Sequence, residues 1–148
     1  MTDFDTFTAR WEQHRQQAQA VNDKNKETLF AALAATNITT IRVDFDGEGD
    51  SGQINNIDAF AIDTPSDLPA AKITIQRLHW GDTVPVSEEI ALEAAIESLC
   101  YDFLEQEHGG WENNDGGYGE FTISVPDRTI ELEFHARYTD TQTYTHSF

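Results

Sequence analysis

Two glycine-rich loops hold most of the residues that could do chemistry. The first loop, residues 44–52, contains four acids and three glycines among nine residues; the acids are Asp44, Asp46, Glu48 and Asp50. Hard cations such as Ca²⁺ bind several oxygen ligands, and glycine lets a backbone fold those oxygens inward. The sequence therefore predicts either a calcium or magnesium site made by these four acids, or a glycine-rich β-turn whose acids are solvated and need no metal.

The spacing in this loop excludes an EF-hand. Counted from Asp44, the glycine at the sixth position is Gly49, but the twelfth residue is Asn55, where a bidentate glutamate is required. The flanking residues also alternate as strands do. Asp44 and Asp46 share one strand face about 7 Å apart. Like charges at that distance are tolerated more readily when a cation binds between them.

The second loop, residues 108–121, combines turn residues with aromatic ones. Asn and Asp beside Gly favour left-handed turns and leave side-chain amides free. This composition predicts a partner-binding surface together with the first loop, and its candidate residues are Trp111, Glu112, Asn113, Asn114, Asp115 and Tyr118. Trp111 has a second interpretation, a lid folded down on the core, which we favour.

A third group of polar residues alternates along two predicted strands. Its members are Arg42, Asp44, Glu131, Glu133, His135 and Arg137. A histidine with two carboxylates on one sheet face suits a metal site or an acid–base pair. An exposed antiparallel sheet with cross-strand ion pairs explains the same pattern, and we favour that interpretation.

No catalytic residue is predicted. Ser51 lies in a GDSG segment like that of serine proteases, but the chain is too short for such an enzyme and no matching His and Asp context appears. Cys100 lies on an apolar helical stripe, where a structural thiol is expected. No phosphate-binding glycine motif and no zinc-ligand spacing is present.

The pattern of apolar residues predicts the elements that carry these loops. Two helical segments are expected near residues 5–20 and 24–36, with the polar stretch 22–26 either interrupting them or facing solvent. Strands at about 41–45 and 53–63 form a hairpin with a bulge at Asn55–Asn56. A loop at 64–69 and a strand at 72–79 follow.

Ser87 is expected to cap the helix that runs to Glu107. Two alternating strands, about 121–125 and 130–138, form a second hairpin, and the polar tail 139–148 is a candidate edge strand. The order α-α-β-β-β-α-β-β predicts an α+β fold in which helices cover one face of an antiparallel sheet of about five strands. We expect a single domain over residues 1–148, with a helical segment at 1–36 and an α+β body at 38–138.

The two loops also carry a family resemblance. The segments FDGEGDSGQI (45–54) and GWENNDGGYGEF (110–121) resemble the FDGxGDSGxI and GWExNxGxxGxF motifs of an uncharacterised prokaryotic family. The resemblance covers residues 38–138. That family is often found on plasmids and other mobile elements beside antirestriction genes, and it has no established active site. The resemblance implies that both loops belong together, and it carries over no catalytic role.

Charge narrows the class of partner. The 148 residues have a formal net charge of -18, and residues 38–148 hold 22 acidic against five basic side chains. Such a body repels phosphate backbones and attracts basic surfaces, although high charge can also serve solubility alone. One cysteine, no leader and no long apolar run predict a cytoplasmic protein without membrane or disulfides.

These observations predict a non-enzymatic, acidic binding protein whose partner is a basic protein surface and not a nucleic acid. The resemblance to a mobile-element family makes the prediction more specific. The protein is then expected to be an inhibitor that binds the nucleic-acid-binding surface of a defence enzyme by phosphate mimicry. One alternative is a domain that binds Ca²⁺ or Mg²⁺ through the two loops; otherwise no cofactor is expected. A further alternative is a small enzyme with its site between the loops. The sequence leaves the oligomeric state open.

Overall fold

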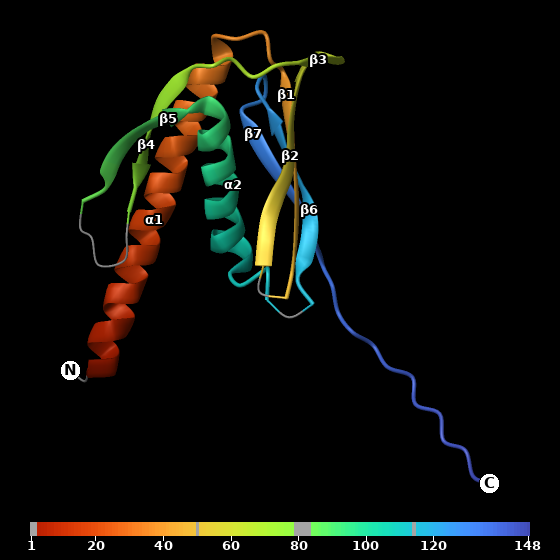
Figure 1. Cartoon of the computed structure of the whole chain (residues 1–148). Coiled ribbons are helices and arrows are strands. Elements are labelled where there is room, and N and C mark those ends of the chain that lie inside the picture. Colours follow the sequence, from red (N-terminus) through yellow and green to blue (C-terminus); the bar gives the residue numbers. More distant parts are fainter. Residues whose placement is uncertain (1–2, 50, 79–83, 114) are drawn as a thin grey trace.

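The computed structural model describes residues 3–49, 51–78, 84–113 and 115–148 (Figure 1). The chain forms an α+β fold, as predicted, with two helices and seven strands in these residues. Five strands form the main antiparallel sheet, in the order β3-β2-β1-β6-β7, and two form a separate sheet, β4-β5.

Helix α1 (Asp3–Ala34) replaces the two predicted helical segments with one continuous helix. Only part of the polar stretch faces solvent, because Asp23 and Lys24 are exposed whereas Asn22 and Asn25 are buried. The Asn25 amide donates to the Gln76 carbonyl at 2.9 Å and accepts from the Gln76 N–H at 2.8 Å, while Asn22 donates to Gln106. These asparagines satisfy buried polar groups, so the helix passes through the stretch without a break.

The main sheet is built from two hairpins that meet at β1 (Thr40–Glu48). β1 pairs with β2 (Ser51–Ala61) on one side and with β6 (Gly117–Ser124) on the other. β6 pairs in turn with β7 (Thr129–Ala136). The register of β1 with β2 shifts between Asp44 and Phe45, which leaves Asn55 unpaired. This confirms the predicted bulge.

The segment between the hairpins differs from the prediction in two places. Residues predicted as a loop contain the short edge strand β3 (Thr64–Ser66), which pairs with the end of β2. Ser87 is not a helix cap. It lies in β5 (Val86–Ala91), opposite Gln76 of β4 (Lys72–Arg77), and α2 (Leu92–His108) starts only after Ala91. Cross-strand pairing overrides the local capping signal here, and Arg77 forms a salt bridge with Glu88.

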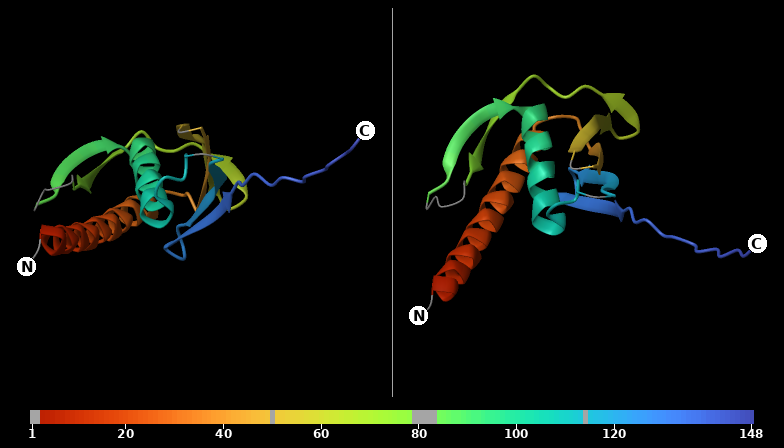
Figure 2. Two further views of the ribbon diagram at one scale, coloured as in Figure 1. Left: turned by 90° about the horizontal axis from the view of Figure 1, so that it is seen from below. Right: turned by 60° about the horizontal axis from the view of Figure 1, so that its bottom comes forward.

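The helices and the small sheet cover one face of the main sheet. Figures 1 and 2 show α2 between the main sheet and a layer made by α1 and the β4–β5 hairpin. The core includes apolar side chains from every layer, such as Phe30, Ile41, Ile75, Leu99 and Phe121. Because the second half of α1 contributes to this core, the predicted helical segment and α+β body share one apolar interior.

Cys100 is buried on α2 within the same core. Burial raises the pKa of its thiol far above the ordinary value, with the carboxylates of Asp102 and Glu97 adding to the effect. A thiol held in the neutral form is a poor nucleophile. The structural role predicted for Cys100 therefore fits its surroundings.

Candidate functional site

The two glycine-rich loops meet at Trp111, which follows the end of α2. A methyl group on Gly47 would lie 2.6 Å from Cζ3 of Trp111, and one on Gly52 would lie 2.5 Å from Cη2. The indole therefore rests directly on the backbone of the β1–β2 hairpin. Trp111 is only 8% exposed and makes an edge-on contact with Phe45 at 5.4 Å between ring centroids. Both the lid and the association of the two loops are confirmed.

Arg137, just after β7, ties the end of the sheet to the first loop. Its guanidinium donates to both carboxylate oxygens of Asp46, at 2.8 and 3.1 Å, and to the carbonyl of Gly47 at 3.2 Å. It also lies over the ring of Tyr118, 4.7 Å from the centroid, and Tyr118 stacks on His135 at 4.8 Å. The Arg137 hydrogen bond lowers the pKa of Asp46 below its ordinary value of 3.8, against the opposing effect of burial.

A row of three carboxylates crosses the open face of the sheet, which is the face turned away from the helices. Asp44 on β1 lies directly opposite Glu120 on β6, and Glu120 lies opposite Glu133 on β7. We call these three residues the acidic row. Desolvation raises the pKa of Glu120 above its ordinary value of 4.5, as do hydrogen bonding to Asp44 and the charge of Asp44; Arg42 and Thr122 act in the opposite direction.

The rest of the open face carries charges of both signs. The neighbouring cross-strand row runs Asp58, Arg42, Thr122 and Glu131, with the Arg42 guanidinium over the ring of Phe60. Among the described residues, the salt bridges on this face are Arg137–Asp46 and the His135–Glu133 contact at 2.9 Å. The expected pattern of cross-strand ion pairs is thus realised mainly by Arg137, and the acidic row places carboxylate beside carboxylate instead.

The four predicted metal ligands occupy different surroundings. Asp44 belongs to the acidic row, Asp46 is bound by Arg137, Glu48 is exposed at the end of β1, and Asp50 lies outside the described residues. Within the described ranges, no three His, Cys, Asp or Glu side chains are arranged to hold a metal ion. A Ca²⁺ or Mg²⁺ site in this loop stays a prediction.

The remaining residues predicted in the second loop have different surroundings. Asn113 forms a turn with Gly110 through its N–H, and Asp115 accepts a hydrogen bond from the Thr139 hydroxyl at 2.8 Å. Glu112 follows Trp111 and has one carboxylate oxygen buried without a hydrogen-bond partner in the described structure. Asn114 lies outside the described residues. Tyr118 belongs to the open face, where it is 43% exposed.

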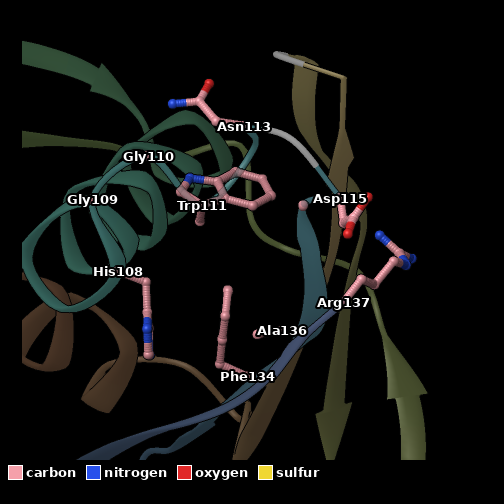
Figure 3. A pocket seen from close by; sticks show the side chains of 10 residues that line it. His108, Gly109, Gly110, Trp111, Asn113, Asp115, Phe134, Ala136 and Arg137 are labelled. Atoms are coloured by element: carbon pink, nitrogen blue, oxygen red, sulfur yellow. The ribbon is translucent and has the colours of Figure 1, made fainter. Parts of the chain in front are cut away.

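Two cavities flank Trp111. The first has a volume of about 340 Å³, and its lining includes His108, Asn113, Asp115, Phe134 and Arg137 (Figure 3). His108 stacks on Phe134 in this wall, with 4.0 Å between ring centroids. The indole separates these side chains from the second cavity. Trp111 thus lines both cavities. A small enzyme site between the loops stays a prediction.

The second cavity, of about 520 Å³, has carboxylates from α2 and from the second loop in its walls: Asp102, Glu105 and Glu112. Burial raises the pKa of Asp102 above 3.8 while the charge of Arg77 lowers it. The Tyr101 hydroxyl, also in the wall, accepts a hydrogen bond from the N–H of Ile54 at 2.8 Å, beside the bulge.

Sequence reasoning named Glu133 among the outward-facing residues but missed Glu120, and it also missed the α2 side of the second cavity. Alternation along β6 and β7 does indicate that both glutamates face outward. The signal that was lacking is the register between strands, which places Glu120 between Asp44 and Glu133.

No helix in the described part of the chain is long and apolar enough to cross a membrane. Comparison with curated proteins finds no match, and neither does comparison with solved structures. A family model does match residues 21–148, which includes both glycine-rich loops and the whole main sheet. The chain therefore belongs to DUF6878, a family of unknown function.

Proposed function

We propose that this protein is a non-enzymatic binding protein that presents the open face of its main sheet to a basic surface of another protein. The observation that carries the proposal is the acidic row, Asp44, Glu120 and Glu133, side by side on three neighbouring strands. The net charge of -18 adds a long-range attraction for such a partner.

Electrostatics explains why the acidic row suits a cationic partner. Like charges directly opposite each other on neighbouring strands destabilise a sheet. Burial raises the pKa of Glu120 most, and a hydrogen bond to Asp44 and the negative charge of Asp44 raise it further. Arginine or lysine side chains laid across the row would relieve the repulsion. Relief of this repulsion would add to the free energy of binding.

The geometry of the row supports mimicry of a nucleic-acid backbone. Neighbouring strands are about 4.8 Å apart, so the three carboxylates form a regularly spaced line of negative charges, as the phosphates of one DNA strand do. A line of carboxylates with spacing of this order can occupy a groove whose basic side chains normally bind phosphates. The resemblance to a family found on mobile elements directs this proposal to a defence enzyme as the protein inhibited.

A defined basic peptide tests the proposal. The variant Asp44→Asn/Glu120→Gln/Glu133→Gln removes the acidic row, and Glu93→Gln/Glu97→Gln/Glu107→Gln removes three exposed acids from α2 as a charge-matched control. Binding to an arginine-rich peptide is measured by fluorescence anisotropy over a range of salt concentrations. We expect the control to keep most of the affinity and the row variant to lose it. Equal losses in both variants would contradict a role for this face.

Competition with duplex DNA tests the mimicry. The same arginine-rich peptide is first bound to labelled duplex DNA, and the protein is then added. We expect the wild-type protein and the α2 control to release the DNA, and the row variant to leave it bound. Release of DNA by all three proteins in proportion to net charge would show that the row has no special part in it.

A further inference from the structure

The last ten residues leave the sheet as an extended tail. Residues 139–148 are separated from the end of β7 by two residues and run away from the body (Figure 1). The side chains of Tyr138 and Tyr144 are 84% and 74% exposed, and Phe148 is fully exposed. Thr139 bonds to Asp115, but the hydrogen bonds found beyond it, at residues 140–148, stay within the tail.

The tail nevertheless has the sequence of a strand. Threonine occupies every second position from residue 139 to 145, and the three aromatic residues Tyr138, Tyr144 and Phe148 fall on the other set of positions. Threonine and aromatic residues favour strands, and alternation with a period of two places them on opposite faces. The even positions also continue the apolar face of β7, which is formed by Ile130, Leu132 and Phe134.

β7 is an edge strand with its outer side open. Among the strands of the described residues, it pairs with β6 alone. The N–H of Arg137 points to β6, where it donates to the Gly116 carbonyl, so the N–H and C=O groups at even positions from 130 to 136 point outward. Ile130, Leu132 and Phe134 are only partly buried, whereas Phe121 and Ile123 on β6 are almost fully buried. The edge therefore has both unpaired backbone groups and uncovered apolar surface.

The tail is poorly suited to fold back on its own β7. A tight hairpin turn needs Gly, Asn or Asp at positions with positive φ. The chain from Ala136 to Thr139 has none of these, and Arg137 is held in line by Asp46 and Gly116. The family match also runs through the tail to residue 148, although it leaves out the first 20 residues. The tail is thus part of the family's domain and not an appendage to it.

We propose that the tail of one copy pairs antiparallel with β7 of a second copy, and that the exchange is reciprocal. In such a two-fold arrangement, even residues of the tail lie opposite even residues of β7, because the outward N–H groups of both strands are at even positions. Tyr144 and Phe148 then cover the apolar face of β7, and the threonines lie beside Glu131 and Glu133. The eight-residue β7 and the ten-residue tail are of matching length.

The same arrangement joins the two main sheets edge to edge. A two-fold axis perpendicular to the sheet keeps both open faces on the same side, so the two acidic rows would form one larger anionic surface. The proposed dimer is argued only from the tail and β7. It therefore does not depend on whether the protein binds the proposed basic partner.

Two adjacent proline substitutions in the full chain test the pairing. Gln142→Pro removes an N–H that would bond to β7 of the other copy, whereas Thr143→Pro removes one that would point away from it. Dimerisation is measured by sedimentation equilibrium. We expect Gln142→Pro to weaken self-association on the order of thirtyfold, because two interface hydrogen bonds are lost per dimer. Thr143→Pro is expected to have a much smaller effect.

Hydrogen exchange supplies the second measurement. In the wild-type protein we expect the amides of Leu132 and Phe134 to be protected, and Gln142→Pro to remove that protection. A monomer with protected β7 amides would overturn the proposal in favour of a tail folded back in the same chain. A monomer with unprotected amides would overturn it in favour of a free tail. A dimer that Gln142→Pro and Thr143→Pro affect equally would place the interface elsewhere.

Discussion

The two faces of the main sheet are made by alternate residues of the same strands, but one is apolar and buried and the other is acidic and exposed. On the helix side, Phe45 of β1 and Phe121 of β6 are about fully buried and in contact. On the open side, the adjacent residues Asp44 and Glu120 repel each other. One face gives the sheet its stability, and on the other we expect the neighbouring carboxylates to lower it. This difference is what the proposed binding role of the open face requires.

Truncating a side chain on the helix side should give the largest effect. Phe121→Ala is expected to lower the free energy of unfolding by about 3–5 kcal/mol, because it opens a cavity in a closely packed core. The neighbouring Thr122→Ala, on the open face, should change it by no more than about 0.5 kcal/mol. Urea denaturation of the two variants checks this. Similar losses of unfolding free energy in both variants would mean that the helix side does not contribute more to stability than the open face.

Contact between the loops should be the next most sensitive feature. Gly52→Ala places a methyl group 2.5 Å from the Trp111 indole, and such overpacking is expected to cost about 1–3 kcal/mol. The adjacent Ser51→Ala is the control, with a change near zero. Thermal unfolding followed by tryptophan fluorescence measures both. An unchanged melting temperature for Gly52→Ala would show that Trp111 does not hold the two loops together.

The ion pair on the open face should matter less, since both partners are partly exposed. Arg137 lowers the pKa of Asp46, so this pair adds stability above pH 3.8 and loses it as the pH falls through the lowered pKa. We expect Asp46→Asn to be less destabilising than Gly52→Ala, with the difference from wild type vanishing in acid. Melting temperatures measured across the acidic range test this, and a difference that stays constant with pH would contradict it.

The acidic row should give the smallest effect and the opposite sign. The pKa of Glu120 is raised, so the folded state holds this proton more tightly than the unfolded chain does. Its contribution to stability is present below pH 4.5 and is lost as the pH rises through the raised pKa. Glu120→Gln should therefore stabilise the protein at neutral pH by roughly 0.2–1 kcal/mol, with the gain growing as the pH increases from 4.5. Destabilisation at neutral pH would mean that the row is not a site of repulsion.

Much of the fold could be predicted because its signals are local. The apolar stripe of α2, the alternation of β1, β6 and β7 and the irregularity at Asn55–Asn56 all lie within short segments. The predictions failed where distant partners decide the outcome. Ser87 looks like a helix cap until β4 pairs with it, and the asparagines of α1 look solvent-facing until Gln76 and Gln106 bind them.

The candidate surface divides in the same way. The sequence by itself determined that this chain is strongly acidic and that Asp44, Glu133 and His135 face outward, because charge is a sum over residues and alternation is a property of one strand. Only the tertiary structure decided that Asp44, Glu120 and Glu133 stand in a line and that Asp46 is bound by Arg137. Register between strands depends on contacts between residues far apart in the chain, and no single segment encodes it.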